Sequence, residues 1–430
     1  MESSMRLPAP LQAAWSGWRR NRGSTAFALR VVIATRLIVW VASIVVVVHF
    51  GENVSAWLDL DPAGLTAPFH SVALDKLLAP GARWDSVWYL SIAQHGYATP
   101  ASANFFPLYP LLISIGARVS GSTLVSGIAI SVVSMLAGMT LLYRLARLDL
   151  DEHAARLTVV LLALFPTSLF FSAVYTTSLF LMLSVAAIYA ARRERWALAG
   201  LCGGLTAATR PNGILLFLPL AMLYLYGPRM APPMSSTGAW WRPRFPVTWS
   251  ISWLALVPAG LTAYLGYLAV AHGAPLAPYR AASVDWGHVF AGPFGAVVRT
   301  LVDVPDDLRG LVSGNARAVG PGDPLSWNVR DLIDLGFLAF AVAGLLAAWR
   351  RLPMAYVAYA FVSLAQALSF PPHHEPMIGF SRYLLPIFPL FMGVAARLSG
   401  RRALTSVVLG LSAVLLAVFS GLWAYWALVP

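Results

Sequence analysis

Uninterrupted apolar runs constrain this chain more than any other feature of its sequence. A membrane-spanning helix needs about 20 apolar residues. Charged residues make up only 11% of the 430 residues, whereas soluble domains carry roughly 25%. The chain therefore cannot cover a water-exposed surface of its size, which excludes a soluble enzyme, a disordered protein and a disulfide scaffold. The long runs are 27–49, 123–146, 249–271, 331–349, 353–370 and 403–426, and a shorter one covers 383–396.

Two further apolar stretches are interrupted by polar residues near their centres. The stretch 155–191 is broken around Pro166 and again at 175–177, and the stretch 196–226 is broken at 209–213, around Arg210 and Pro211. Because proline ends helices and the residue before it avoids the helical region, each stretch is predicted to form a hairpin of two short helices. The sequence thus predicts an all-α polytopic membrane protein with about 11 transmembrane helices.

One apolar run, 105–119, is assigned by the positive-inside rule, which places arginine and lysine on the cytoplasmic side. If this run crosses the bilayer, the later arginine clusters face outward. If it lies along the outer interface, 19 basic and 5 acidic residues lie inside, against 10 basic and 13 acidic residues outside, and Arg36 lies in the first span. The second arrangement is strongly favoured, and the net charge of +12 is then a topology signal and not a nucleic-acid footprint.

This topology divides the chain into three parts. Residues 1–26 form a basic cytoplasmic N-terminus, 27–230 form one transmembrane module with an outer loop at 50–122, and 231–430 form a second, variable module with an outer loop at 272–330. The C-terminus is expected outside, in the plasma membrane of a bacterium. Irregular backbone at membrane depth is tolerated only against protein or a wet cavity. The short hairpins therefore predict a cavity that faces outward.

The densest group of polar and aromatic residues lies in the first outer loop, at 81–97. Trp84, Trp88, Tyr89 and Ile92 recur at helical spacing, which is typical of an interfacial helix with an aromatic edge. Asp85 stands near the start of this helix, where it is equally well explained as a helix cap or as a chemical group.

Other acidic residues outside the membrane are weaker candidates. Asp59 and Asp61 form an Asp-x-Asp pair, which is more often a solvated turn before proline but is the second choice for an essential acid. Asp303, Asp306 and Asp307 are expected to form a solvated acidic face.

The motifs of this region resemble the GPI mannosyltransferase II (phosphatidylinositol-glycan class V) family. The resemblance begins with Arg83-Trp84-Asp85 and continues through Ile92-Ala-Gln-His-Gly-Tyr97 and Phe105-Phe-Pro-Leu-Tyr-Pro110. The segments Ala173-Val-Tyr-Thr-Thr-Ser-Leu-Phe180 and Ala208-Thr-Arg-Pro-Asn-Gly213 follow in the same order, and Ser381-Arg-Tyr383 is a weaker match.

The resemblance implies a GT-C glycosyltransferase that moves a sugar, mannose or a similar hexose, from a polyprenyl-phosphate carrier on the non-cytoplasmic side. Asp85 would be its essential acidic residue, the first outer loop would carry two juxtamembrane helices, and module 27–230 would be the catalytic one. The acceptor would be a lipid-linked or cell-surface glycan. Where the family commonly has Tyr-Ser-Glu, this chain has Tyr175-Thr176-Thr177, which puts the identity of the acceptor in doubt more than the type of reaction.

The chemistry of that transfer selects the remaining candidate residues. A single inverting displacement needs one base to take the acceptor proton, and arginine matches the leaving phosphate with two hydrogen bonds, so no metal or cofactor is expected. Arg210 and Arg382 are the best phosphate ligands because each sits at the outer end of a span, where a charge is costly. His374 and Arg83 are further phosphate candidates. The substrate candidates are Trp84, His95, Tyr97, Tyr175, Asn212 and Tyr383.

A transporter or flippase of a lipid-linked sugar is the alternative function, because it also needs an outward cavity lined by arginine. Such a protein is expected to place polar residues at several mid-span positions and to consist of two pseudo-symmetric halves. The sequence offers few of these features, so the transferase is the preferred prediction.

Overall fold

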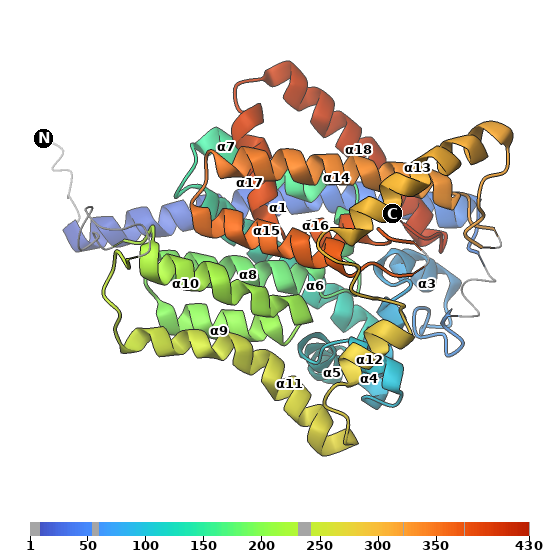
Figure 1. Ribbon diagram of the computed structural model, residues 1–430, viewed down its shortest axis with the longest axis horizontal. Helices are drawn as coiled ribbons and strands as arrows, with labels where there is room; N and C mark the ends of the chain where they lie inside the picture. The colour runs from blue at the N-terminus through green and yellow to red at the C-terminus, as the bar shows by residue number, and fades with distance from the viewer. Residues whose placement is uncertain (1–8, 54–59, 231–241, 321, 374, 430) are drawn as a thin grey trace, which may run out of the picture.

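A computed structural model describes residues 9–53, 60–230, 242–320, 322–373 and 375–429, and in this part of the chain every regular element is a helix. The apolar helices run roughly parallel to one another and form one bundle (Figure 1). They correspond to the eleven predicted spans: α1 (Ala9–His49), α6 (Thr123–Ala146), α7 (Glu152–Leu164), α8 (Thr177–Arg192), α9 (Trp196–Ala207), η4 with α10 (Pro211–Leu216, Phe217–Tyr226), η5 with α11 (Trp249–Ala255, Leu256–His272), α14 (Trp327–Trp349), α15 (Met354–Ser369), α17 (Phe388–Leu398) and α18 (Arg402–Ala424).

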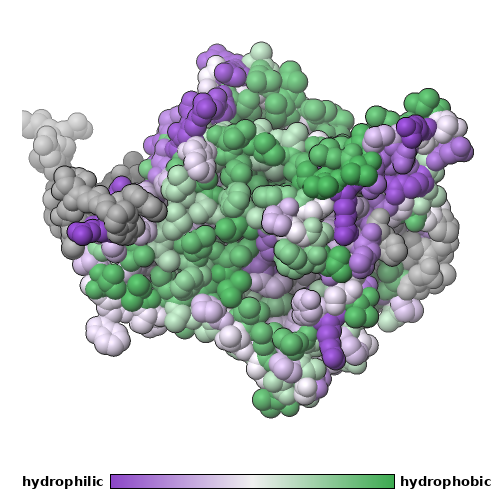
Figure 2. Space-filling model, in the orientation of Figure 1, coloured by the Kyte–Doolittle hydropathy of each residue, from purple (hydrophilic) through white to green (hydrophobic). Residues whose placement is uncertain are grey.

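Five stretches of helix among the described residues are long and apolar enough to cross a membrane, and several shorter apolar helices accompany them. The five are Gly23–His49, Thr123–Ala146, Trp249–His272, Trp327–Trp349 and Arg402–Ala424. Figure 2 shows hydrophobic side chains gathered over the middle of the bundle and hydrophilic ones mainly toward its two ends. The prediction of an all-α, multi-pass membrane protein is therefore confirmed.

Both interrupted stretches form hairpins, as predicted. The first consists of α7, the short η3 (Ser168–Phe171) and α8, and the second consists of α9, η4 and α10. At the tip of the second hairpin η4 folds back tightly onto α9, so that a Cβ atom on Gly213 would lie 2.4 Å from the Thr206 carbonyl oxygen. Only glycine fits this approach, which places Arg210 and Asn212 beside the end of α9.

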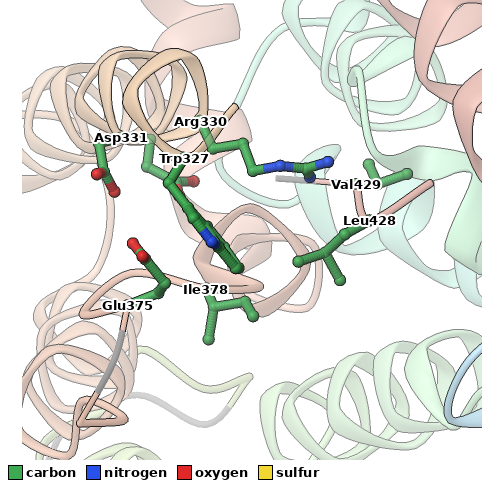
Figure 3. Close-up of a pocket in the computed structure, with 8 residues that line it drawn as sticks. Trp327, Arg330, Asp331, Glu375, Ile378, Leu428 and Val429 are labelled. Carbon is green, nitrogen blue, oxygen red and sulfur yellow. The ribbon is translucent and has the colours of Figure 1, made fainter. Parts of the chain in front are cut away.

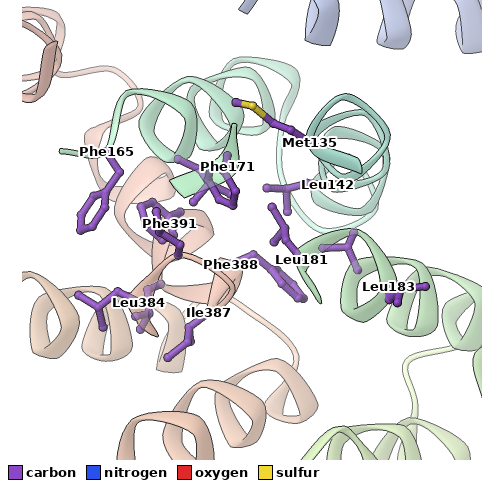
Figure 4. Packing of buried hydrophobic residues seen from close by; sticks show 14 of the residues in the cluster. Met135, Leu142, Phe165, Phe171, Leu181, Leu183, Leu384, Ile387, Phe388 and Phe391 are labelled. Atoms are coloured by element: carbon purple, nitrogen blue, oxygen red, sulfur yellow. The ribbon is translucent and has the colours of Figure 1, made fainter. Parts of the chain in front are cut away.

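Aromatic side chains fill the core where the first hairpin meets α17. Phe165, Phe171, Phe388 and Phe391 are buried there, with Leu181 of α8 beside them (Figure 4). The rings of Phe165 and Phe391 meet edge to face with their centroids 5.1 Å apart, a favourable geometry for aromatic pairs. This packing fixes the first hairpin against the C-terminal helices and so positions the residues that follow η3.

The first outer loop contains α3 (Val72–Leu78), η1 (Ala79–Gly81), α4 (Ser86–His95), η2 (Pro100–Asn104) and α5 (Leu108–Ser120). The run 105–119, predicted to lie along the interface, forms α5, which is seen nearly end-on in Figure 1 while the long helices run across the page. The second outer loop contains α12 (Ala277–Val284) and α13 (Gly295–Ser313), and the short α16 (Phe380–Leu384) precedes α17. All of these elements gather at one end of the bundle (Figure 1).

Two acidic residues of the outer loops that the sequence suggested to be solvated are buried in the structure. Asp61 is buried and accepts hydrogen bonds from the backbone N–H groups of Leu65 and Thr66, both at 2.8 Å, so it stabilises a turn. Asp59 lies outside the described residues. The predicted acidic face is correct for Asp306, which forms an exposed ion pair with Arg309, and wrong for Asp307, which is 1% exposed.

Asp307 belongs to a cluster in which three buried carboxylates share the half-exposed Arg317, and Glu375 joins the segment 371–382 to it. Arg317 donates to Asp307 at 3.0 Å, to Asp331 at 2.7 Å and to Glu375 at 3.2 Å. Figure 3 shows the side chains of Asp331 and Glu375 pointing toward each other. No pattern in the sequence indicated this cluster, because its members come from three separate segments of the chain.

This cluster gives a pH-dependent stability. Burial, together with the nearby charge of Asp331, raises the pKa of Glu375 to about 7 from its ordinary 4.5. Between these pH values the folded protein keeps a proton that the unfolded chain has lost, so stability falls as the pH rises. We expect the unfolding temperature in detergent to decrease from about pH 5 to about pH 7.5, and Glu375→Gln to reduce this decrease. Equal slopes in the two proteins would show that Glu375 does not titrate in this range.

Candidate functional site

A cavity of about 240 Å³ opens among the elements that gather at the outer end of the bundle. Its first wall comes from α4, η2 and the tip of the second hairpin, and its second wall comes from α12, α15 and α16. Four of the predicted phosphate and substrate candidates meet here, although they come from distant parts of the sequence: Arg210, Asn212, Arg382 and Tyr383. The lining residues with polar side chains are Asp85, Tyr89, Asn104, Arg210, Asn212, Tyr279, His288, Gln366, Arg382 and Tyr383.

Asp85 faces this cavity and does not act as a helix cap. It occupies the N-cap position of α4, but its side chain makes no capping hydrogen bond. Its Oδ2 instead accepts a hydrogen bond of 2.6 Å from Nη1 of Arg382, 297 residues further along the chain. Within the described residues no donor is hydrogen-bonded to Oδ1. The carboxylate is therefore held by one oxygen while the other remains available to a hydroxyl group.

The backbone around Asp85 is held from below by Tyr175. The buried Tyr175 hydroxyl accepts a hydrogen bond of 3.0 Å from the backbone N–H of Asp85, and the guanidinium of Arg382 lies over its ring at 5.1 Å from the centroid. Trp84, just before Asp85, has a φ of 52°, which is uncommon for a residue other than glycine and often marks a functional site. Tyr175 is thus a supporting residue and not a lining one.

Arg210 is held by Thr176 and Thr177, the first residues after the buried Tyr175. Its Nε donates to the Thr176 hydroxyl at 2.5 Å and its Nη2 to the Thr177 hydroxyl at 2.9 Å. Its Nη1 is buried and has no hydrogen-bond partner, as is also true of Nε of Arg382. The two threonine hydroxyl groups therefore fix the position of Arg210. They bring no negative charge, and one donor of Arg210 remains unpaired.

The cavity therefore has an excess of positive charge. Arg210 and Arg382 contribute two guanidinium groups, and Asp85 contributes the only carboxylate among the described lining residues. Guanidinium groups with unpaired donors bind phosphate with charge-assisted hydrogen bonds. Asn212, on the same hairpin tip, has a buried side-chain oxygen without a partner and can accept from a hydroxyl group. The arrangement suits a phosphorylated sugar beside a base.

The second wall also contains His288, Tyr279 and Gln366, which the sequence analysis did not identify. The backbone N–H groups of Val289 and His373 donate to the carbonyls of Pro371 and Gly287, both at 3.1 Å. This pairing holds His288 with its Nδ1 2.8 Å from the Phe370 carbonyl oxygen. A carbonyl only accepts, so Nδ1 carries the proton and Nε2 is the remaining polar atom of the ring. A single histidine in a long loop gave no motif by which to find it.

Arg83 and Trp84 have structural roles. Arg83 is buried and forms an ion pair of 2.8 Å with Glu52, and it also donates to the Ala424 carbonyl oxygen. The indole N–H of Trp84 donates to the Ala427 carbonyl oxygen at 3.2 Å. Both residues thus fasten the first outer loop to the end of α18, and neither lines the cavity. Arg83, predicted to bind the phosphate, instead pairs with Glu52.

His95 and Tyr97 also lie away from the cavity lining. His95 is exposed at the C-terminal end of α4. The Tyr97 hydroxyl donates to the Phe105 carbonyl oxygen at 2.7 Å, and its ring packs against Tyr264 and Tyr267 of α11. His374 lies outside the described residues. Of the predicted site residues, the structure brings together Asp85, Arg210, Asn212, Arg382 and Tyr383, with Tyr175 beneath them.

Relatives named as mannosyltransferases match part of the chain. GPI alpha-1,6-mannosyltransferase 2 from Rattus norvegicus is 32% identical over 163 residues, which is 35% of this chain and 33% of the relative. The human protein of the same name is 28% identical over 167 residues, covering 36% and 33% of the two chains. GPI mannosyltransferase 2 from Yarrowia lipolytica is 29% identical over 138 residues, covering 32% and 38%. The chain thus matches about a third of the length of these relatives.

Among solved structures, the oligosaccharyltransferase of Archaeoglobus fulgidus in its apo form aligns with a TM-score of 0.42 and 15% identity, over 92% of this chain and 56% of that one. The same enzyme with an inhibitory peptide and a dolichol-phosphate aligns with a TM-score of 0.44 and 16% identity, over 94% and 56%. The family model described as mannosyltransferase (PIG-V) matches residues 26–223. Over this segment, which contains Asp85, Tyr175, Arg210 and Asn212, the chain matches the mannosyltransferase (PIG-V) family, as its motifs predicted.

Proposed function

We propose that this protein is an integral-membrane glycosyltransferase that moves mannose, or a similar hexose, from a polyprenyl-phosphate carrier to a lipid-linked or cell-surface glycan. The observation that carries this proposal is the cavity in which the Asp85 carboxylate stands beside two arginines with unpaired donors. The mannosyltransferase names of the relatives support the choice of sugar. No cofactor or metal enters the proposed reaction.

The proposed step is a single inverting displacement. The acceptor hydroxyl oxygen forms a bond to the anomeric carbon of the sugar, while the bond from that carbon to the phosphate oxygen breaks. The acceptor proton passes to the Asp85 carboxylate, which acts as general base. Arg210 and Arg382 stabilise the additional negative charge on the departing polyprenyl phosphate, and such fixed cationic donors are among the strongest sources of rate enhancement.

The reaction is proposed to occur on the non-cytoplasmic face. The cavity lies at the end of the bundle that carries both long loops, and the positive-inside rule assigns that end to the outside. The same rule supports a cytoplasmic N-terminus and an outer C-terminus, in the plasma membrane of a bacterium. Proposed partners are the lipid-linked donor, a lipid or glycan acceptor and membrane lipids, and no nucleic acid.

The test is sugar transfer in detergent. Purified protein is incubated with radiolabelled polyprenyl phosphomannose and a membrane-lipid extract, and labelled products are separated from the donor. We expect a new labelled lipid or glycan, together with release of polyprenyl phosphate in equal amount. A flippase forms no product in micelles, so an unchanged donor that nevertheless crosses the bilayer of proteoliposomes would favour the alternative function.

A further inference from the structure

The segment between α15 and α16 determines where Arg382 stands in the polar cavity. It begins directly after Phe370 and ends at Arg382, and both of these residues line the cavity. We refer to residues 371–382, of which the structure describes all but residue 374, as the connecting segment. Because Arg382 donates a hydrogen bond of 2.6 Å to Asp85, the place of this segment also affects the proposed base.

Consecutive turns make the second half of the connecting segment a stiff link. The backbone N–H groups of residues 378, 380 and 382 each donate to the carbonyl oxygen three residues earlier, at 3.3, 2.9 and 3.1 Å. The side chains of Met377 and Phe380 are buried, so the link is also packed against the bundle. Close-packed groups transmit displacements to their neighbours. A displacement of Glu375, at the beginning of the link, is therefore passed on to Arg382.

Glu375 is itself held by one cation. Its Oε1 accepts a hydrogen bond of 3.2 Å from Nη1 of Arg317, and this is the only ion pair of Glu375 among the described residues. Its Oε2 is buried and has no hydrogen-bond partner. The carboxylate lies beside Asp331 of α14 (Figure 3), which carries the same charge and repels it. The position of Glu375 thus depends on Arg317.

Arg317 connects three elements that would otherwise repel one another. Its Nη2 donates to Asp307 of α13 at 3.0 Å and to Asp331 of α14 at 2.7 Å, while its Nη1 binds Glu375. Like charges destabilise one another most where they are buried, so the shared arginine lets three buried carboxylates approach. None of these four residues lines the polar cavity. Their influence on Arg382 passes through the connecting segment.

We propose that Arg317 and Glu375 are positioning residues for sugar transfer. Their ion pair fixes the connecting segment so that Arg382 holds the Asp85 carboxylate in the orientation needed to take the acceptor proton. This inference rests on the proposed function. Arg210 is fixed separately, by two threonine hydroxyl groups at the start of α8. Binding of the donor phosphate therefore depends less on this ion pair than the transfer step does.

Two matched substitutions test this inference. Glu375→Ala detaches the connecting segment from Arg317, whereas Asp331→Ala removes a carboxylate from the same arginine and leaves the segment attached. Each variant deletes one of the three carboxylates bound to Arg317, so we expect their unfolding temperatures to be similar. Glu375→Gln is the conservative variant, because its amide oxygen still accepts from Arg317. All are assayed by initial rates of transfer at several concentrations of polyprenyl phosphomannose.

We expect Glu375→Ala to lower kcat by about 10- to 100-fold, since a misplacement of about 1 Å can cost about 10²-fold, and to leave the KM for the donor nearly unchanged. Glu375→Gln is expected to restore most of the kcat, and Asp331→Ala to keep it. Equal losses of kcat in Glu375→Ala and Asp331→Ala would overturn the inference, because the cluster would then only stabilise the fold. A loss that appears only as a higher KM would overturn it as well.

A double substitution shows whether the effect passes through Arg382. If Glu375 acts by placing this arginine, then adding Glu375→Ala to Arg382→Gln is expected to cause little further loss of kcat. Non-additive effects of this kind are the sign of residues that act through one another. If the two losses multiply in full, Glu375 acts by another route and the inference is wrong.

Hydrogen–deuterium exchange separates this inference from the proposed function, because it requires no transfer. The backbone N–H groups of residues 376–383 are expected to exchange faster in Glu375→Ala than in the original protein, Glu375→Gln or Asp331→Ala. Equal exchange in all four proteins contradicts the positioning role, even where transfer is observed. An original protein that transfers no sugar, but shows the expected difference in exchange, contradicts the proposed function alone.

Discussion

Replacing Asp85 with Asn is expected to lower kcat for sugar transfer by about 10²- to 10⁴-fold, the usual contribution of a positioned general base. The substitution preserves the size of the side chain and can still accept a hydrogen bond from Arg382, but the amide cannot take a proton from the acceptor. The KM for the donor is expected to change little, because the phosphate is bound by arginines. The measurement is initial-rate transfer at several donor concentrations.

The control for this variant is Asp306→Asn. Asp306 is also an aspartate of the outer loops with an arginine partner, but its ion pair with Arg309 is exposed. Asp306→Asn is expected to have the activity of the original protein. Gel filtration and the unfolding temperature show whether Asp85→Asn remains folded. Full activity in a folded Asp85→Asn protein would show that Asp85 is not the base. Asp61, the second choice for the essential acid, is buried in a turn, so another mechanism would then be required.

Replacing Arg210 with Gln is expected to lower kcat/KM for the donor by about 10²- to 10³-fold, the scale for removing one fixed donor that stabilises developing charge. Arg210 lines the cavity and has an unpaired Nη1, so its loss removes positive charge from the place where the phosphate is proposed to leave. Arg210 gives a clearer test than Arg382, because Arg382 also holds Asp85. The measurement is donor-dependent kinetics together with binding of polyprenyl phosphate.

Arg210→Lys and Arg309→Gln complete this experiment. Lysine keeps the charge but not the two directed hydrogen bonds to Thr176 and Thr177, so Arg210→Lys is expected to retain an intermediate activity. Arg309→Gln removes an exposed arginine and is expected to have no effect. If Arg210→Gln lowers activity only in proportion to a loss of folded protein, Arg210 is structural and the phosphate must bind elsewhere.

The departure from the family pattern at Thr177 has a structural consequence. A glutamate at this position would bring a negative charge next to Arg210, to which the Thr177 hydroxyl is hydrogen-bonded. In this chain the two hydroxyl groups hold Arg210 without neutralising it. The second wall, with His288, Tyr279 and Gln366, lies in segments beyond residue 223, where the family match ends. The residues that line the cavity therefore come partly from the matched and partly from the unmatched part of the chain.

The sequence by itself determined the helices, the two hairpins and the segment that holds Asp85. Each of these depends on local properties: the length of an apolar run, a proline or glycine that ends it, and a motif of neighbouring residues. The same local reasoning selected Arg210 and Arg382, because a charge at the end of an apolar span is costly, and the structure places both beside the same cavity.

Only the tertiary structure decided which of the candidates meet. Arg83 and Arg382 are both arginines beside short motifs, yet Arg83 points to Glu52 and α18 while Arg382 reaches Asp85. His288 reaches the same cavity because its loop pairs with the segment around Pro371, and Glu375 shares a buried cluster with Asp307. These contacts join residues from distant parts of the chain, and the direction of each side chain depends on how whole helices pack, which no local pattern encodes.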